Sequence, residues 1–589
     1  MTAGLSATTA PAGPRPLREL WRLAGPYWNC ERRAKVRGAT LLFFLLTVAQ
    51  VGLAVWGNYW NRALFDALEQ RTARGVLLQV GVFAIIFVLS ILVTAAHLVV
   101  KRWLQLDWRE WITRKVVGEW LEDGRHYRLR FSRGEHDNPD QRIAEDIRIA
   151  TEVAIALAHT LVYSLLILVM FADILWSISG SIVLPGTDVA VPGYLVPLAF
   201  LYAAVGSVLG WLLGRPLVST TNALQSAEAD FRFGLSRARE HAESIALLQG
   251  ERRERTGSDV RFRTIVRDWD RQSVAYMGLV AFGTAYGALL PVFPILVAAP
   301  QYIAGVMSLG VLMQAAQAFQ SLTSALSWPV NNIGEIARCR ASADRVLALH
   351  EDLGRLDGES GPAADPRLSI GRSGRGELRL EGVALAESDG SPLLDPVDAV
   401  IGRGERVAIR GEPAVTGPLF RALGGLWPWG AGRIVLPADG EIDYLPQRPF
   451  LPQGSLSEAL CYPRAPDSYR ASVLRQALGV AGLAWLADRL DEEDDWEQAL
   501  PLHAQQRLAF ARVLLHRPAW VLMEEATDGV DGDGEREMLE LLQRELPGVS
   551  IVAILYRNGE RSLYGREIPL ARASSSATGA GRGSAEGAH

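Results

Sequence analysis

The chain has 589 residues, 49% of them hydrophobic, and its mean hydropathy is slightly positive at +0.11. This length exceeds what one hydrophobic core organises, so we expect two or more domains, part of them in a membrane. A formal net charge of −5, without a long basic stretch interleaved with aromatic residues, argues against nucleic-acid binding. Three widely separated cysteines and scattered histidines argue against a disulfide framework and against a metal site.

Apolar stretches in the amino-terminal half are each about 20 residues or longer, which is enough to cross a bilayer. They lie at 38–57, 76–100, 152–178, 189–213, 276–304 and 306–328. The last has a polar side, Gln314, Gln317 and Gln320, which would face other helices or a cavity. We predict an all-α membrane domain with six transmembrane helices over 17–350, preceded by a disordered N-terminus at 1–16.

Arginine-rich segments predict the orientation of these helices, because basic residues mark the cytoplasmic side. The arginine-rich segments are 15–37, 101–150 and 214–272. Both termini are therefore expected in the cytoplasm, and the membrane helices are expected to continue into it. Within these segments, 137–148 and 228–251 combine a turn or cap signal with an amphipathic helix. Either they are solvated faces with i,i+4 charge pairs, or they contact a second domain, and their placement favours contact.

The carboxy-terminal half has the pattern of a soluble α/β domain. Residues 351–375 are rich in Gly, Pro, Ser and charge and are interpreted as a linker. Residues 376–572 alternate strand, glycine turn and helix, which favours a mostly parallel sheet with helices around it. The low-complexity tail, 573–589, is expected to be disordered.

One loop in this half, "GEPAVTGPLFRALGGLWPWGAGRI" at 411–434, has the outline of a phosphate-binding loop without its phosphate-binding residues. The pattern G-x-x-x-x-G-K-[ST], laid on Gly411, requires Gly, Lys and Ser or Thr where the chain has Thr416, Gly417 and Pro418. The chain's lysines are Lys35, Lys101 and Lys115. All three precede the loop by far, so no placement of the pattern on this half of the chain supplies the phosphate-binding lysine. The loop is therefore either a lost nucleotide site or an ordinary glycine-rich turn.

Several segments favour the first alternative. The sequences "PLREL…AGPYW", "NYWNRALFDALEQR", "DNPDQRIAEDIR", "RPFLPQGSLSEALCYP" and "QQRLAFARVLLHRPAWVL" resemble ABC half-transporters. Within these, the chain is similar to the bacterial subfamily that joins an SbmA/BacA-like membrane domain to an ATP-binding cassette, which is related to peroxisomal fatty-acyl transporters. The resemblance covers about residues 17–570. It implies an ABC exporter-like membrane domain followed by a cytoplasmic P-loop NTPase-like cassette.

The resemblance also implies roles for individual positions. Gly417 stands where the Walker lysine is expected, and Pro418 lacks an N–H that would point at phosphate. The helix that follows, "LFRAL", is expected to begin about one residue early. Glu524 replaces the aspartate that orients Mg²⁺, and Glu525 occupies the position of the catalytic base. Tyr556 stands at the switch histidine.

The remaining cassette motifs are partly retained. Gln447 is the expected Q-loop glutamine, and Asp531 is also retained. The signature motif, close to L-S-x-G-E-Q-Q-R, is represented by Leu500 to Arg507 and lacks its serine and glycine. The early strand "LRLEGVALAESDG" offers no aromatic ring for adenine.

Together these departures predict that ATP and Mg²⁺, the ancestral cofactors, bind weakly or not at all. Losing the lysine, the hydroxyl and the adenine stack removes roughly 5 kcal/mol of binding free energy or more. We therefore predict a transporter subunit that has lost ATP hydrolysis. A competent heterodimer partner would not restore it fully, because one composite site would lack the lysine and the other the signature serine and glycine.

The implied substrate is a bulky amphipathic solute, such as a peptide, a cobalamin-like cofactor or a fatty-acyl compound. Two alternatives remain open. The first is proton-coupled uptake of the SbmA/BacA kind, for which Asp173 is the clearest intramembrane candidate, with His97 and His159 next. The second is a regulatory or scaffolding pseudo-transporter. The expected partners are the bacterial inner membrane and a second half-transporter, in a homodimer or heterodimer.

Overall fold

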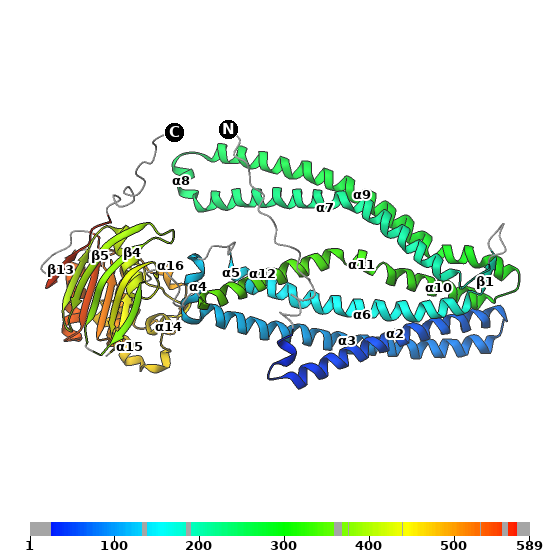
Figure 1. The fold of residues 1–589 in the computed structure, drawn as a ribbon, viewed down its shortest axis with the longest axis horizontal. Helices are drawn as coiled ribbons and strands as arrows, with labels where there is room; N and C mark the ends of the chain where they lie inside the picture. Colours follow the sequence, from blue (N-terminus) through cyan, green and yellow to red (C-terminus); the bar gives the residue numbers. More distant parts are fainter. Residues whose placement is uncertain are drawn as a thin grey trace, which may run out of the picture. The chain divides into compact units, whose positions relative to one another are not determined.

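The structure is a computed structural model that describes residues 25–131, 138–183, 190–358, 368–374, 376–438, 440–530, 532–556 and 564–573. The chain divides into two compact units. The first is Met1–Glu122 with Glu135–Arg355, and the second is Asp123–Gly134 with Leu356–His589. Figure 1 shows long helices in the first unit and sheets with short helices in the second. Residues 1–16 and 574–589, expected to be disordered, lie outside the described residues.

In the part of the chain that is described, five helices are long and apolar enough to cross a membrane. They are α2 (Arg33–Glu69), α3 (Ala73–Leu121), α6 (Ile147–Ile178), α7 (Leu195–Glu240) and α9 (Glu251–Ile303). They coincide with the first five predicted stretches and confirm them. The fourth begins at Leu195 rather than near 189, because Pro192 ends a short strand and Gly193 has a positive φ of 64°.

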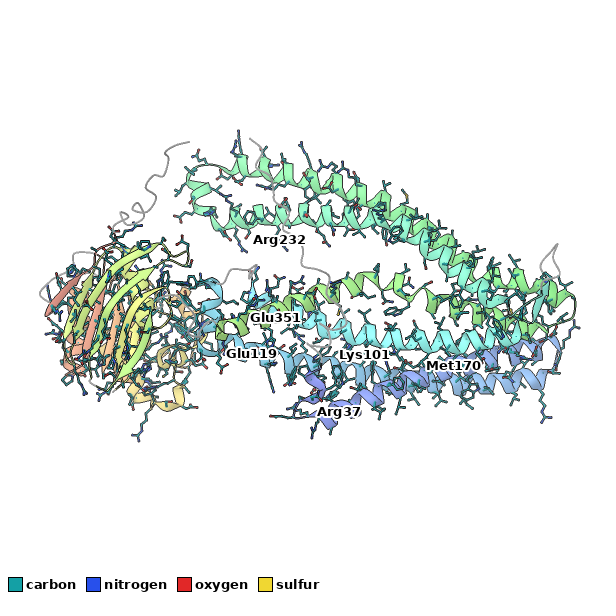
Figure 2. The ribbon with its side chains drawn as sticks, viewed as in Figure 1. Arg37, Lys101, Glu119, Met170, Arg232 and Glu351 are labelled. Atoms are coloured by element: carbon teal, nitrogen blue, oxygen red, sulfur yellow. The ribbon has the colours of Figure 1, made fainter. Side chains whose placement is uncertain are left out.

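The helices α3, α7 and α9 are much longer than a bilayer is thick. They contain 49, 46 and 53 residues, or about 70–80 Å at 1.5 Å per residue. A hydrocarbon core is only about 30 Å thick, so each helix extends well beyond it. Charged side chains such as Glu119 on α3 and Arg232 on α7 lie on the portions away from Met170 of α6 (Figure 2). The prediction that the membrane helices continue outside the bilayer is consistent with these lengths.

The sixth predicted crossing corresponds to α10 (Leu309–Leu326), which is not among the helices that meet the membrane criterion. It packs against α2, α6, α7 and α9 and contributes the buried Phe319 and Leu322 to their core. Its polar side faces a neighbouring helix, as expected. Asn58 donates to the main-chain oxygen of Gln314 at 3.2 Å, and Asn61 donates to Oε1 of Gln317 at 2.8 Å. Six crossings therefore stay a prediction.

The rest of the first unit consists of short elements and one further long helix. They include a 3-10 helix (Tyr27–Asn29), α5 (Pro139–Gln141), a π-helical turn (Arg142–Asp146), the strands β1 (Ser181–Val183) and β2 (Ala190–Pro192), α8 (Ala242–Leu247), α11 (Trp328–Asn331) and α12 (Ile333–Gly358), whose last residues belong to the second unit. Because α12 continues to Gly358 and β3 begins at Ser369, ordered structure extends into the segment interpreted as a linker.

The second unit contains two larger sheets, and the predicted α/β pattern is confirmed. The parallel sheet has the order β13-β6-β12-β11-β8, and the other has the order β3-β7-β4-β5. The strands of the first are β6 (Arg406–Arg410), β8 (Ile442–Leu445), β11 (Trp520–Glu524), β12 (Ser550–Leu555) and β13 (Arg566–Pro569). Those of the second are β3 (Ser369–Ser373), β4 (Leu378–Ala386), β5 (Pro392–Ile401) and β7 (Gly430–Pro437).

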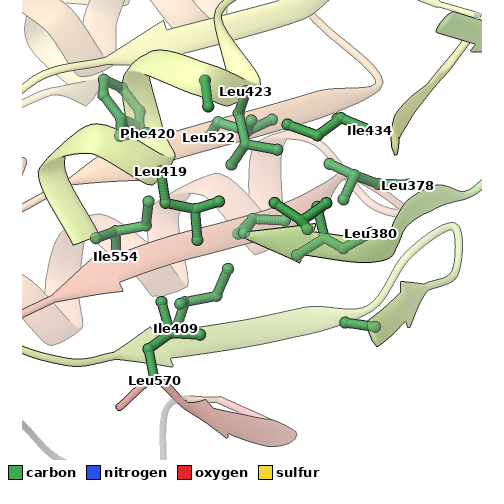
Figure 3. Close-up of a cluster of buried hydrophobic side chains, with 14 of the residues drawn as sticks. Leu378, Leu380, Ile409, Leu419, Phe420, Leu423, Ile434, Leu522, Ile554 and Leu570 are labelled. Atoms are coloured by element: carbon green, nitrogen blue, oxygen red, sulfur yellow. The ribbon is translucent and has the colours of Figure 1, made fainter. Parts of the chain in front are cut away.

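Helices cover these sheets, and a short strand pair, β9 (Gly454–Ser455) and β10 (Glu493–Asp494), lies among them. The helices are α13 (Pro413–Leu423), α14 (Leu456–Cys461), α15 (Ala471–Val480), α16 (Trp496–Ala499), α17 (Leu502–His516) and α18 (Gly532–Glu545). Figure 3 shows Leu419 and Leu423 of α13 packed with side chains of both sheets. This core fixes α13, and with it the loop that the sequence singled out.

The second unit also includes the segment Asp123–Gly134, which contains α4 (Arg125–Arg128). Phe131 meets the rings of Trp429 and Trp427 edge-on, with centroids 4.8 Å and 5.9 Å away. Trp427 is buried, and its indole N–H donates to the main-chain oxygen of Ala386 at 3.0 Å. A piece of chain from the amino-terminal half is thus part of the cassette's aromatic core.

Candidate functional site

The candidate site lies where three neighbouring parallel strands end. Gly411 follows β6, Glu524 ends β11 and Tyr556 follows β12, and β12 lies between the other two. Loops at the carboxyl ends of parallel strands form the usual ligand site of such sheets. The structure therefore brings together the predicted residues Gly417, Glu524, Glu525 and Tyr556.

The loop after β6 is shorter than the sequence suggested. The expectation that the helix begins near Leu419 is wrong, because α13 begins at Pro413, two residues after Gly411. Proline at the first helical position favours this early start, since its fixed φ suits the helix. The hydroxyl of Thr416 donates to the main-chain oxygen of Glu412 at 2.9 Å.

This early start removes the donors that a phosphate would need. Thr416, Gly417 and Pro418 are all buried inside the helix. An N–H beyond the first turn of a helix is used by the helix itself, and Pro418 has none. The backbone here is therefore a helix interior and does not present a cradle of free N–H groups.

Side chains fill the space beside Gly417. A Cβ at this glycine would lie 3.2 Å from Oε1 of Glu524, 3.7 Å from the Tyr556 hydroxyl and 3.9 Å from an Arg421 nitrogen. The Tyr556 hydroxyl donates to Oε1 of Glu524 at 2.5 Å. Burial raises the pKa of Tyr556, and the neighbouring Glu524 carboxylate raises this pKa further. The phenol consequently stays protonated at physiological pH and serves as a donor.

The carboxylate of Glu525 is also engaged. Glu525 is buried, has a positive φ of 45°, and accepts a short hydrogen bond from the Tyr556 main-chain N–H. Its own N–H donates to the main-chain oxygen of Ile554 at 3.1 Å. A non-glycine residue in this conformation is strained, so the surrounding bonds hold it in place. The residue at the expected catalytic-base position therefore bonds, through its carboxylate and its main-chain N–H, to the backbone at the end of β12.

The predicted Gln447 belongs to a second cluster of hydrogen bonds. Its amide donates to Asp528 at 3.2 Å, and its main-chain oxygen accepts from Gln506 at 2.9 Å. Gln506 in turn accepts from the Gly529 N–H at 2.9 Å. This cluster joins the loop after β8, α17 and the loop after β11. The predicted Asp531 lies outside the described residues.

The signature region begins α17 without a capping side chain. Pro501 occupies the N-cap position and makes no side-chain cap hydrogen bond, whereas a serine there would accept one. Leu500 is buried in the helical core of the cassette, and His503 is exposed. The buried Gln505 donates to main-chain oxygens of Glu497 and Leu500 at 2.7 and 2.8 Å.

Arg421 and Asp528 were not expected at the site. Arg421 lies one helical turn after Gly417, so an i,i+4 spacing on α13 could have indicated that both face the same strands. Asp528 follows Glu524 and Glu525 closely in the sequence. Its pairing with Gln447 depends on how β8 and β11 are placed side by side, which periodicity does not reveal.

The intramembrane candidates differ in their surroundings. Asp173 is exposed on α6. His97 of α3 and His159 of α6 are brought together, with ring centroids 4.2 Å apart, and Phe43 of α2 stacks on His97 at 4.6 Å. The two histidines therefore form a ring pair in which His97 is buried and His159 is half-buried.

Comparison with known proteins agrees with this architecture. Residues 25–292 match the family model described as ABC transporter transmembrane region 2. An uncharacterized ABC transporter ATP-binding protein of Synechocystis is 30% identical over 85% of the chain and 75% of the relative. The human lysosomal cobalamin transporter ABCD4 is 25% identical over 79% of the chain and 80% of that protein.

A solved structure shares the fold. It is described as a bacterial Atm1-family ABC exporter with ATP bound, and it matches with a TM-score of 0.65 at 18% identity. The match covers 90% of this chain and 91% of that one. With its multi-pass helical region and its cytoplasmic α/β cassette, the chain belongs to the ABC transporter family.

Proposed function

We propose that the chain is a subunit of a D-type ABC transporter that moves a bulky amphipathic solute and whose own cassette does not hydrolyse ATP. The D-type assignment is supported by the similarity to ABCD4, which is described as a cobalamin transporter. The solute classes are those implied by the resemblance: peptides, cobalamin-like cofactors or fatty-acyl compounds. The place of action is the bacterial inner membrane, with both termini in the cytoplasm.

The observation that carries the proposal is the hydrogen bond from Tyr556 to Glu524 beside Gly417. In a working cassette this place holds phosphate, Mg²⁺ and a lysine. Here the carboxylate at the aspartate position is bonded to the phenol of Tyr556, and no lysine offsets its charge toward phosphate. At Gly417 the backbone of α13 is a helix interior, so its N–H is used within the helix and does not compensate.

The same reasoning extends to a dimer. In ABC dimers each nucleotide lies between the phosphate-binding loop of one chain and the signature of the other. In a homodimer both sites would therefore lack the lysine and the signature serine and glycine. In a heterodimer each site would lack one of the two sets, so any remaining ATP turnover would belong to the partner.

Equilibrium binding of a fluorescent ATP analogue with Mg²⁺ to the purified full chain tests the proposal. We expect no saturable binding up to millimolar nucleotide, with an intact relative as the positive control. The variant Glu525→Gln is the matched control for hydrolysis, because it removes the only retained base position. Binding in the micromolar range, or ATP turnover that disappears in Glu525→Gln, would contradict the proposal.

Proton-driven uptake is the second candidate function, and the ring pair of the buried His97 with the half-buried His159 favours it. Uptake into proteoliposomes under an imposed pH gradient distinguishes the two modes. Uptake that requires the gradient and is lost in Asp173→Asn or His159→Gln would support proton coupling. Uptake that requires ATP and does not depend on the pH gradient would exclude proton coupling. A chain that shows no uptake but pairs stably with another subunit would be a scaffold.

A further inference from the structure

The helices α2 and α3 carry basic residues at the same end of their apolar runs. The run on α2 begins at residue 38, and the run on α3 ends at residue 100. Arg37 on α2 and Lys101 on α3, directly outside these runs, lie at a similar level along the two helices (Figure 2). Basic residues in this position lie at the head groups of a bilayer. This end of the helix pair is therefore where the first unit meets the surface of a membrane.

Two side-chain contacts show how α2 and α3 lie against each other here. Phe43 of α2 stacks on His97 of α3, with ring centroids 4.6 Å apart. The ammonium of Lys35 lies 5.3 Å from the centre of the Trp103 ring, in a cation–π contact. Moving from Phe43 back to Lys35 on α2 thus corresponds to moving from His97 on to Trp103 on α3, as in an antiparallel pair. Arg102, the neighbour of Trp103, therefore lies near the level of Lys35.

Arg102 belongs to an exposed face of α3. Val99, Arg102 and Leu106 recur at i, i+3 and i+7, so they share one face, which points away from the buried His97. Val99 is 69% exposed and Leu106 is 65% exposed. A cation thus stands between two exposed apolar side chains, at the place where the apolar run ends.

The same combination continues on α2. Leu42 follows Lys35 by two helical turns, and both side chains are exposed. Because Lys35 lies over Trp103, this face of α2 adjoins the exposed face of α3, and Trp103 is half-buried between them. We name this region the α2–α3 surface; it consists of Lys35, Leu42, Val99, Arg102, Trp103 and Leu106.

The α2–α3 surface is positive and includes no carboxylate. The first carboxylate along α2 is Asp66, and the first along α3 is Asp107. Asp107 is engaged, because it accepts from the Tyr27 hydroxyl at 2.9 Å. Neither Lys35 nor Arg102 forms an ion pair with another of the described residues. Both cations can therefore pair with an external anion.

These properties match an acidic phospholipid better than other occupants. A guanidinium and an ammonium both bind phosphate well, and an acidic head group brings no ammonium that would need a carboxylate. Exposed leucine and valine side chains suit acyl chains, and tryptophan is typical of the membrane interface. A second copy of the chain that met this face with its own would bring like charges together, which is unfavourable.

We infer that the α2–α3 surface binds one acidic phospholipid of the surrounding bilayer, with its phosphate at Lys35 and Arg102 and an acyl chain along Leu42 and Val99. This lipid is a component of the membrane and not the transported solute. The inference therefore goes beyond the proposed function and does not depend on it.

Binding of individual lipids to the purified full chain in detergent, measured by native mass spectrometry, tests the inference. The probes are palmitoyl-oleoyl phosphatidylglycerol, phosphatidylcholine with the same acyl chains, and inorganic phosphate. We expect phosphatidylglycerol to bind at least about tenfold more tightly than phosphatidylcholine, because each basic residue contributes about fivefold at an anionic surface. Equal affinities would overturn the inference. Inorganic phosphate that displaces phosphatidylglycerol would identify a free anion as the ligand and would also overturn it.

Variants locate the site. Lys35→Gln with Arg102→Gln should weaken phosphatidylglycerol binding at least about tenfold and leave phosphatidylcholine binding unchanged. Lys35→Arg with Arg102→Lys keeps both charges and should keep the preference. The matched control is Arg232→Gln with Arg239→Gln, which removes two exposed arginines from α7, well beyond its apolar stretch, and should have no effect.

Two results with these variants would overturn the inference. One is unchanged phosphatidylglycerol affinity in Lys35→Gln with Arg102→Gln while the melting temperature shows a folded protein. The other is a loss of affinity that follows the dissociation of a dimer, which would assign the surface to a second copy of the chain. Failure of the proposed function is seen separately, as tight Mg·ATP binding, because that measurement concerns the cassette and none of these residues.

Discussion

The hydroxyl of Tyr556 donates a 2.5 Å hydrogen bond to the carboxylate of Glu524 at the ends of two neighbouring parallel strands. Tyr556 also donates its main-chain N–H to Glu525. Tyr556 therefore bonds to both acidic residues at the end of β11, Glu524 in the strand and Glu525 directly after it. This arrangement is stable in itself and needs no ligand to satisfy it.

Replacing Tyr556 by Phe removes the hydroxyl and leaves Glu524 without this donor. We expect a loss of about 2 kcal/mol in cassette stability at pH 7, within the range for a hydrogen bond to a charged group. The raised pKa of Tyr556 makes its contribution fully present below pH 10 and progressively lost above it. Denaturant unfolding of both proteins should show a gap that narrows as the pH rises above 10. A constant gap would contradict this.

The substitution Gly417→Lys alone should not restore nucleotide binding. The new side chain would begin 3.2 Å from Oε1 of Glu524 and would pair with that carboxylate. The backbone around residue 417 would remain a helix interior, with its N–H groups used within α13. Titration with Mg·ATP should remain flat, and Gly424→Lys at the end of α13 is a matched control for added charge. Micromolar binding by Gly417→Lys would show that the missing lysine was the only obstacle.

Asp146 and Arg345 form a two-pronged ion pair, with bonds of 2.7 and 2.5 Å. The Asp146 side chain is 7% exposed, whereas that of Arg345 is 48% exposed. Arg345→Gln leaves a buried carboxylate without its partner and should cost about 2 kcal/mol, reduced by the water that reaches the arginine side. Thermal unfolding of Arg345→Gln, of Asp146→Asn and of the double variant measures the coupling between the two side chains. Additive losses would contradict a direct interaction.

Asp66 caps the start of α10 from α2. Its Oδ1 accepts from the Ser308 hydroxyl at 2.6 Å and from the Gly310 N–H at 3.1 Å. Asp66→Ala removes a negative charge and a capping group at a helix N-terminus, so we expect about 1 kcal/mol of destabilisation. Asp66→Asn should recover part of it. Melting temperatures in detergent provide the measurement. A value for Asp66→Asn equal to that of the unmodified protein would contradict a charge contribution, and a value equal to that of Asp66→Ala would contradict a contribution from the capping hydrogen bonds.

The three cysteines should differ in reactivity. Cys339 and Cys461 are buried, and burial raises the pKa of each thiol to about 11. The reactive thiolate is therefore scarce at both positions at neutral pH. A maleimide reagent should label only Cys30 in the folded protein and all three cysteines after denaturation. The variant Cys30→Ser should abolish labelling of the folded protein.

Much of the fold could be predicted because its signals are local. Apolar runs long enough to span a bilayer identified five helices, and alternating strands and glycine turns identified the parallel sheet. The phosphate-binding pattern laid on Gly411 predicts a loop up to about residue 418, whereas α13 begins at Pro413, because proline suits the first helical position.

The contacts that complete the sites could not be predicted. The bond from Tyr556 to Glu524 and the pairing of His97 with His159 join residues far apart in the chain. Each depends on which strands or helices are neighbours, and a single sequence does not specify this. The sixth crossing is undecided for a related reason: Gln314 lowers the hydropathy of α10, and only its neighbouring helices explain why a glutamine is buried there.

The placement of Phe131 against Trp427 and Trp429 has a consequence for biosynthesis. The segment Asp123–Gly134 leaves the ribosome long before the loop that carries these two tryptophans. At about 5–20 residues per second, it waits for many seconds before its aromatic partners exist. A fragment beginning at Leu356 would lack this segment and would leave the two tryptophans without Phe131. The cassette of this protein is therefore completed by a segment that lies outside its carboxy-terminal half.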